Sequence, residues 1–454
     1  MSVSAKKRIW GWWFFDWASQ PYNTLLLTFI FGPYFAELAR DYYQANGLEV
    51  EASKAASQAY WTATQTVTGI IIAILAPVLG VVADGRGRKM PWIWVFSVMY
   101  VVGAFLLWWA IPGMPTLFWA AFWFAFGFIG MEMATNFTNA LMPSLASHED
   151  MGKVSGTGFA FGYFGGVIAL FVFLLFFAEN AETGKTLIGI SPVFGLDPET
   201  REGTRSVGPF TALWYVVFMV PFFLWVKEPA VQGGKKVGAA LAGLGRAIVA
   251  LKQRPSLLVF LIASMFYRDA LNATYALGGA FASNVMGWTV IQSGTFGIIA
   301  AIAATIASWA GGKLDSSVGP KPVIMMSVVV LTLTIIVMMN LTPDTLFGVK
   351  LPDGSPLPDI VFYGCGVVIG ACGGIAQAAS RTLMVFHTSE HDAAGDFGFY
   401  GLSGKATAFL APALITWATL EMGNARLGIA PLVGLFLIGF LLMIWVKPRG
   451  ERPA

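Results

Sequence analysis

Long apolar stretches recur along the whole chain and constrain its fold more than any other feature. Each is long enough to cross about 30 Å of hydrocarbon as a helix. Charged residues make up only 12% of the sequence, roughly half their share in a soluble domain, so too few remain to cover a water-facing surface. We therefore predict an all-α integral membrane protein with twelve transmembrane helices. The expected spans are 12–38, 58–83, 91–111, 115–142, 155–178, 209–226, 256–283, 290–311, 321–341, 359–386, 396–420 and 427–446.

The basic residues predict the orientation of these helices, because cytoplasmic connections are enriched in Lys and Arg. Basic clusters occur at Lys6–Arg8, at Arg86–Lys89 and in the connection 227–255, which all lie on one side of a twelve-helix chain. The pattern places both termini in the cytoplasm. We expect the lipid bilayer, in a bacterial inner membrane, as the surroundings of this chain.

The connection 227–255 also divides the spans into six and six. We predict a first six-helix bundle at 1–226, a cytoplasmic linker at 227–255 and a second six-helix bundle at 256–454. The formal net charge is only +3, which gives no reason to expect a nucleic acid as partner. We expect the chain to act as a monomer.

The two halves share short motifs. A glycine, three further residues and an aspartate, followed by another glycine and basic residues, occur at the same end of two equivalent spans. The residues are Gly80, Asp84, Gly87, Arg88 and Lys89 after the second span, with a degenerate copy at Gly311, Asp315, Gly319 and Lys321 after the eighth. Asn139–Met142 in the fourth span parallels Arg381–Met384 in the tenth. Such pairing is typical of transporters built from internal repeats.

This motif and its copy resemble those of the major facilitator superfamily, although Gly85 stands where that family usually has a base directly after the aspartate. Further segments resemble one branch of it, the vacuolar amino-acid effluxer-like permeases and their bacterial relatives. These segments are Phe15–Tyr22, Asn139–Ala146, Gly152–Gly158, Gly373–Arg381 and Phe399–Lys405. The resemblance implies the major facilitator fold, transport by alternating access, a motif that acts as a conformational latch, and amino acids as a substrate class.

Polar and ionisable residues within the spans are the candidates for a solute or ion site, because a charge in hydrocarbon costs at least about 2.5–3.5 kcal/mol and usually faces a cavity or a partner. They form stripes at helical spacing on spans one, four, seven, ten and eleven. The candidates are Asp16, Gln20 and Asn23; Glu132, Asn136 and Asn139; Arg268, Asp269, Asn272 and Tyr275; and Gln377, Arg381 and Lys405.

Each candidate also has a structural interpretation. Asp16 lies close to the inner membrane end and could pair locally with a base, and Glu132 could be a hydrogen-bonded structural glutamate. Arg268 could hold a substrate carboxylate in a bidentate fork, or form an internal salt bridge that fixes helix packing. Adjacent helix side chains diverge by about 100°, so Arg268 and Asp269 need not pair with each other, and either could pair with a residue on another helix. Arg381 lies late in span ten and could be a gate residue. The glycine stripes at Gly158, Gly162 and Gly166 and at Gly366, Gly370 and Gly374 predict close helix packing.

The leading interpretation is a secondary transporter of a small polar or zwitterionic solute, first of all an amino acid, coupled to protons through Glu132, Asp16 or Asp269. The 17 tryptophans would also suit a cation-coupled sugar or glycoside carrier. A membrane scaffold, or a protein that handles a lipid or pigment, is the alternative outside transport.

The sequence has no motif for a nucleotide or another cofactor, and we expect neither a cofactor nor an enzymatic activity. His387, Glu390 and His391 match an inverted zinc-protease pattern, whose spacing would put both histidines on one helix face. No soluble domain is expected that could hold a third ligand, so we predict no metal site.

Overall fold

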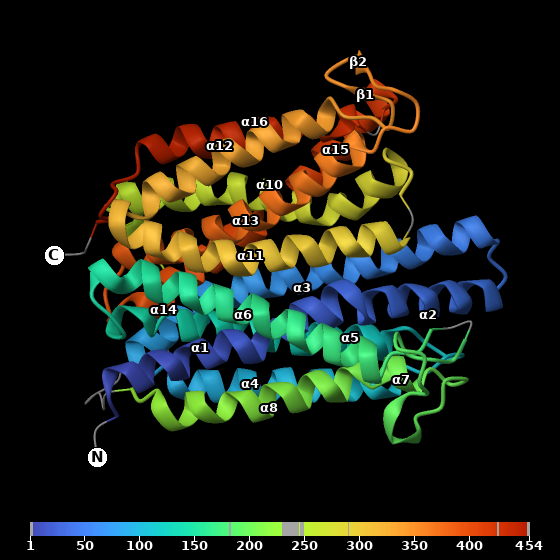
Figure 1. The fold of residues 1–454 in the computed structure, drawn as a ribbon. Helices are drawn as coiled ribbons and strands as arrows, with labels where there is room; N and C mark the ends of the chain where they lie inside the picture. Colours follow the sequence, from blue (N-terminus) through green and yellow to red (C-terminus); the bar gives the residue numbers. More distant parts are fainter. Residues whose placement is uncertain are drawn as a thin grey trace. The chain divides into compact units, whose positions relative to one another are not determined.

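The computed structural model of this chain is almost entirely helical (Figure 1). It describes residues 3–180, 183–228, 245, 249–288, 290–424 and 426–451. Most of the predicted linker, including the basic residues Lys235, Lys236 and Arg246, lies outside these ranges. The described strands, β1 (Thr345–Leu346) and β2 (Val349–Lys350), form one short antiparallel hairpin.

The chain forms two compact units, and they do not follow the order of the sequence. The first unit contains 1–74, 88–138 and 161–232, and the second contains 75–87, 139–160 and 233–454. Two short segments of the first half of the sequence therefore belong to the second unit. The division into six-helix bundles at 1–226 and 256–454 stays a prediction.

The first unit is built around long helices that run alongside one another, with α8 against α1 and α4 (Figure 1). Its described elements are α1 (Ala5–Pro21), η1 (Tyr22–Phe29), α2 (Phe31–Ala45), the first two thirds of α3 (Val50–Arg86), α4 (Met90–Leu106), η2 (Leu107–Trp109), α5 (Phe118–Asn139), the second half of α6 (His148–Phe176), η4 (Val193–Gly195), α7 (Glu202–Arg205) and α8 (Val207–Trp225).

In the second unit, α13 packs between α11 and α12, and α10 packs on α16. The short segments from the first half, which include the end of α3 and the start of α6, pack at one end of these helices. The other described elements are η3 (Met142–Ser144), α10 (Pro255–Asn284), α11 (Val290–Val318), α12 (Pro320–Met339), α13 (Leu357–Phe386), α14 (Ala393–Ala406), α15 (Leu410–Met422), η5 (Leu427–Ile429) and α16 (Pro431–Ile444).

Ten helices of the described residues are long and apolar enough to cross a membrane. The two other expected spans, the first and the eleventh, are each broken. The first begins as α1, changes at Pro21 into the π-helical segment η1 and continues as α2. The eleventh is divided into α14 and α15 at Thr407–Phe409. The total of twelve spans and the cytoplasmic termini stay predictions.

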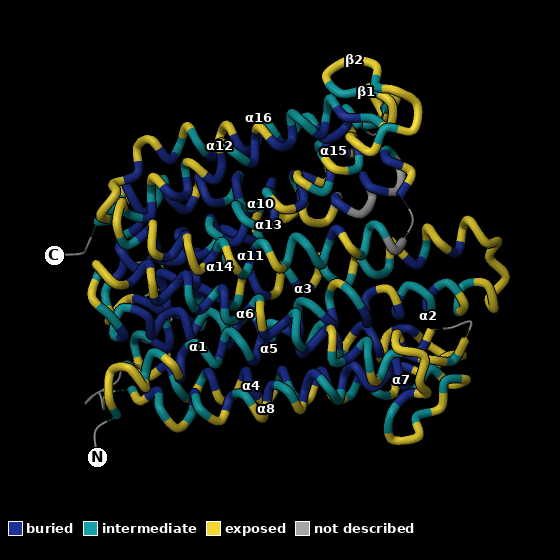
Figure 2. Tube along the Cα trace, in the orientation of Figure 1, coloured by how far each residue is buried: buried dark blue, intermediate teal, exposed yellow. Residues whose placement is uncertain are grey.

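Exposed positions recur along many of the long helices (Figure 2), and large apolar residues occupy many of them. Examples are Ile70 and Ile74 on α3, Leu213 on α8 and Leu333 on α12. A soluble protein rarely exposes extensive apolar surface, so lipid is the surrounding that these faces fit. The buried side is dense in aromatic rings, such as the contact between Tyr22 and Tyr100 in the first unit.

The glycine stripes pack as predicted. Gly162 and Gly166 lie against α1, where an added Cβ would come within 3.2 Å of Asp16 Cβ and 2.6 Å of Thr24 Oγ1. On α13, Gly366 lies against Phe296 and Gly374 against Ser308, both on α11. Small residues let these helices approach closely without voids.

Candidate functional site

One end of the second unit collects most of the paired motifs, and we call it the motif end. Gly80 and Asp84 lie within the last two turns of α3, so they are helical and only Gly87–Lys89 forms the loop. Gly87 has φ +67°, a left-handed conformation that closes the helix at low cost only for glycine. Gly319, in the second copy, has φ +91° and joins the end of α11 to the start of α12.

Asp84 binds the start of another helix. Its carboxylate oxygens accept the backbone N–H groups of Ala394 at 3.1 Å and Gly395 at 2.6 Å. These amides belong to the first turn of α14, whose own N-cap residue, Asp392, makes no capping hydrogen bond. Gly80 lies directly against Ala394, where a Cβ would collide with the backbone. A carboxylate at a helix N-terminus is stabilised by the unpaired N–H groups and the helix dipole.

The second copy of the motif lies against the start of α6. Asp315 lies on the last turns of α11, and an added Cβ at Gly152 would come within 2.7 Å of its Cγ. The Ser316 hydroxyl accepts the Lys153 N–H at 3.0 Å. Both oxygens of Asp315 are buried, and neither makes a hydrogen bond to a described residue. The Thr382 hydroxyl, which donates to Ala378 O at 3.2 Å, is the polar side chain beside the Asp315 carboxyl.

Arg381 directly contacts Asn139, the residue at the corresponding position of the paired motif in the first half. It is 3% exposed and donates to Ser155 Oγ at 3.1 Å, Ser155 O at 2.8 Å and Asn139 Oδ1 at 3.3 Å. Its guanidinium also lies 4.2 Å from the ring centroid of Phe159. Arg381 therefore ties α13 to the segment 139–160 by the multiple donors that only a guanidinium offers.

A further polar cluster at this end ties the start of α10 to α14. Arg254 forms a two-point ion pair with Asp396, at 2.9 Å for each contact, and also donates to His387 O. His387 lies between Ser256 Oγ and Leu383 O, each 2.9 Å from one ring nitrogen. Burial lowers the pKa of the His387 imidazole to about 4.

His387 and His391 do not have the arrangement in the structure that the zinc-protease spacing predicts. Helix α13 ends at Phe386, so the two histidines do not share a helix face, and that expectation is wrong.

The remaining candidates of the second unit line α10, α13 and α14. Arg268 and Asp269 go to different partners: Arg268 donates to Tyr400 O at 2.9 Å and stacks on the Tyr400 ring, whereas Asp269 accepts the Ala411 N–H at 2.9 Å. Gly404 makes room for the guanidinium, because a Cβ there would lie 2.6 Å from it. Asn272 and Tyr275 are exposed, and Gln377 and Lys405 are half-buried.

The candidates of the first unit lie on α1, η1 and α5. Asp16 and Gln20 are half-buried beside the glycine stripe of α6. Asn23 lies in the π-helical segment, with its amide 4.0 Å from Met131 Sδ on α5. Segments of π-helix often occur at functional sites, and the sequence gives no sign of this one apart from Pro21. Glu132 and Asn136 are half-buried on α5, one helix turn apart.

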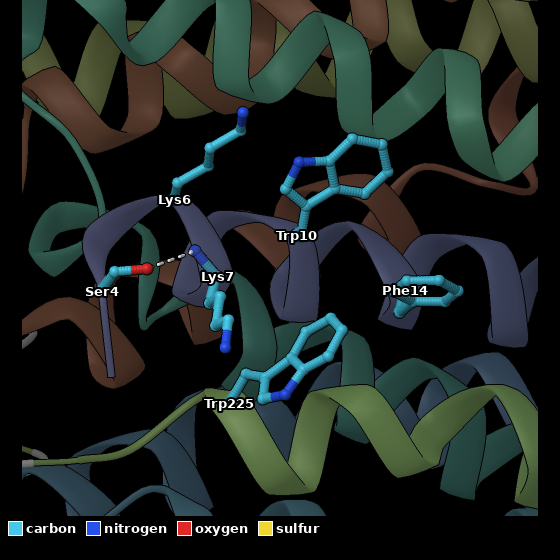
Figure 3. A pocket seen from close by; sticks show the side chains of 6 residues that line it. All are labelled: Ser4, Lys6, Lys7, Trp10, Phe14 and Trp225. Atoms are coloured by element: carbon cyan, nitrogen blue, oxygen red, sulfur yellow. Dashed lines mark hydrogen bonds between the residues drawn. The ribbon is translucent and has the colours of Figure 1, made fainter. Parts of the chain in front are cut away.

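A groove of about 370 Å³ opens at the start of α1 (Figure 3). Its lining consists of Ser4, Lys6, Lys7, Trp10, Phe14 and Trp225. Lysines beside tryptophans are typical of the membrane–water interface. None of the predicted solute-binding residues lines this groove.

The structure thus brings together Asn139 with Arg381 and Asp84 with α14. Sequence reasoning missed Ser155, Arg254 and Asp396 as parts of the same end. Ser155 lies within a segment that carries the family resemblance, but nothing local to Arg254 or Asp396 indicates that they meet across 142 positions.

The fold is the one found in solved transporters of the major facilitator superfamily. The proton:xylose symporter XylE superposes with a TM-score of 0.72 over 98% of this chain and 96% of that chain, at 9% sequence identity. The outward conformation of FucP superposes with a TM-score of 0.67 over 97% and 98%, at 13% identity.

Within this class, the chain belongs to the family described as "Vacuole effluxer Atg22 like", whose profile matches residues 4–453. The MFS-type transporter YxiO of Bacillus subtilis is 25% identical over 96% of this chain and 94% of that protein. Autophagy-related protein 22 of Cryptococcus neoformans is 24% identical over 66% of this chain. The chain spans about half the length of that fungal relative. The resemblance seen in the sequence is therefore confirmed.

Proposed function

We propose that this protein is a secondary transporter that moves a small polar or zwitterionic solute, with an amino acid as the first candidate, by proton-coupled alternating access. The proposal rests on the motif end, the end of the second unit where most of the paired motifs lie. There, a few polar contacts join segments from both halves of the sequence, among them Asp84 with α14 and Arg381 with Asn139 and Ser155. Polar contacts of this kind, made partly to backbone groups, can break and re-form together, as a two-state gate requires.

The side chains that would bind the solute are those on the transmembrane stripes. Arg268 is half-buried, and its guanidinium is oriented by Tyr400. A guanidinium has five N–H donors and matches a carboxylate bidentately, so Arg268 suits the carboxylate of a zwitterion. Gln20, Asn23, Asn136, Asn272, Tyr275, Gln377 and Lys405 would supply further hydrogen bonds.

Proton coupling would use an acid that the solute cavity reaches. Glu132 and Asp16 are half-buried in the first unit, and Asp269 is buried in the second with one backbone donor. A bacterial inner membrane is the location that we propose, since the bacterial relative matches this chain almost from end to end.

The test is transport by the purified protein in proteoliposomes. We would measure uptake of labelled amino acids with and without an imposed pH gradient, together with thermal stabilisation by amino acids, peptides, sugars and nucleosides. Arg268→Ala should abolish stabilisation by amino acids, and Glu132→Gln should abolish the response to the pH gradient. Lys350→Ala, on the exposed hairpin strand β2, is the matched control and should change neither.

Other outcomes would redirect the proposal. Stabilisation by sugars alone, with sugar uptake driven by sodium or protons, would support the sugar carrier. No response to any polar solute would overturn polar-solute transport and favour a lipid-handling protein or a scaffold.

A further inference from the structure

The connection between α6 and α7 holds an exposed apolar tip that the transport function does not require. Thr186–Leu196 contains no charged residue, although acidic and basic residues flank it on both sides. Leu187 is 68% exposed, Ile188 52% and Phe194 87%. Figure 2 shows most of the connection beside α7 as exposed. Three large apolar side chains in water would be costly at about 25 cal/mol per Å² of exposed surface.

The exposure of this tip is built into the backbone. The Thr186 N–H bonds to Ile190 O, and the Gly189 N–H bonds to Thr186 O, both at 2.8 Å, so Leu187 and Ile188 are presented on a closed turn. Phe194 has φ +62°, a left-handed conformation that is strained for an aromatic residue. Strain and exposure at the same residue indicate that its side chain is held outward for contact with something.

Polar contacts fix the rest of the connection. Buried Glu179 accepts from Thr204 N at 2.9 Å and from Thr204 Oγ1 at 2.7 Å, and it pairs with Arg201 at 3.2 Å. Arg201 also pairs with Glu37 in the middle of α2. These contacts fix the two ends of the connection, so the tip has a defined position.

The position of the tip next to α6 indicates what kind of surface it contacts. The Leu187 N–H donates to Leu174 O at 3.2 Å, two residues before α6 ends at Phe176. The Phe194 ring lies 6.0 Å from the Phe177 ring. The tip thus folds back beside the last turn of a membrane-spanning helix, on which Phe171 and Phe176 are also exposed.

We propose that Leu187, Ile188 and Phe194 insert into the lipid leaflet that surrounds the end of α6 and anchor the α6–α7 connection to the membrane surface. The apolar side chains continue the lipid-facing surface of α6. Lys185, exposed directly before the tip, stands where a basic side chain can reach lipid phosphates. A lipid leaflet explains why a stretch without charges occurs within an otherwise charged connection.

The experiment measures what surrounds the tip in a bilayer. In a background with Cys365→Ala and Cys372→Ala, the only native cysteines are removed. Nitroxide labels are then placed singly at Ile188→Cys, Phe194→Cys and Glu199→Cys. The last is an exposed position on the polar part of the same connection. Each protein is reconstituted into phosphatidylethanolamine–phosphatidylglycerol nanodiscs, and collisions with oxygen and with a water-soluble nickel chelate are compared.

The expected result is a severalfold higher ratio of oxygen to nickel collisions at 188 and 194 than at 199. If the nickel chelate reaches all three positions equally, the tip lies in water and the proposal is overturned. If neither reagent reaches 188 and 194, protein covers the tip, in a second copy or elsewhere, and the proposal is also overturned. Two tip positions are used, so one poorly folding variant does not decide the outcome. The experiment does not measure transport, so its outcome is independent of the proposed function.

Discussion

The two copies of the motif make a matched pair for testing the latch. In the first copy, Asp84 accepts two backbone N–H groups of α14, at 3.1 and 2.6 Å. In the second, the oxygens of Asp315 are buried without a hydrogen bond from any described residue. The isosteric change of aspartate to asparagine should therefore destabilise the closed motif end at Asp84 but not at Asp315.

The expected magnitude at Asp84 follows from its contacts. An amide keeps one acceptor oxygen, but its NH2 group faces the second N–H and cannot accept it. Hydrogen bonds to a charged group contribute about 1.5–3 kcal/mol each, and a charge at a helix N-terminus contributes about 0.3–1 kcal/mol. Asp84→Asn should thus destabilise the closed motif end by about 2–4 kcal/mol, a shift of roughly 30- to 1,000-fold in its equilibrium with an open state.

At Asp315 no bond to a backbone donor is lost. Replacing a buried carboxylate by a neutral amide also removes the cost of burying an unpaired charge. Asp315→Asn should therefore leave the closed state unchanged or stabilise it.

The assay is alkylation of a cysteine at the motif end. Ala378 is 2% exposed, and its carbonyl accepts the Ser155 hydroxyl, so it lies inside the contact between α13 and segment 139–160. Ala378→Cys, in the background without native cysteines, should react with a water-soluble maleimide only when this end opens. We expect Asp84→Asn to accelerate labelling by at least roughly 30-fold and Asp315→Asn not to accelerate it. Equal rates in the two variants would refute the reasoning.

Three further predictions follow from the same region. Arg381→Lys should greatly reduce transport in proteoliposomes, because an ammonium cannot replace the contacts with Ser155 and Asn139; a variant with wild-type rates would exclude a gate role. Lowering the pH from 7.5 to 5 should reduce the free energy of unfolding by about 2 kcal/mol through His387, because the unfolded imidazole binds a proton near pH 6.5 and the folded one only near pH 4. The thermal midpoint of His387→Gln should lose that part of the pH dependence, and an unchanged dependence would contradict it. Gly87→Ala should destabilise the protein by about 1–2 kcal/mol because φ at this position is +67°. The control Gly69→Ala lies in the middle of α3 with open space around it and should not destabilise the protein. Equal thermal midpoints of the two variants would contradict backbone strain at Gly87.

The sequence by itself determined the class of structure and the places where helices approach. Hydropathy and helical spacing are local properties, so they located the apolar helices and the glycine stripes, such as Gly162 and Gly166 against α1. The paired motifs marked the same end of equivalent helices for the same reason. Local patterns also indicated the family, because its motifs are short and contiguous.

Only the tertiary structure decided which residues meet. Arg381 and Asn139 are 242 positions apart, and Arg254 and Asp396 are 142 apart. No local pattern encodes either pairing, because it depends on how distant helices pack. The π-helical segment after Pro21 and the break between α14 and α15 likewise interrupt stretches that the sequence predicts as single spans. Hydropathy measures the preference of side chains for lipid, and it does not register how the backbone hydrogen bonds of a span are arranged.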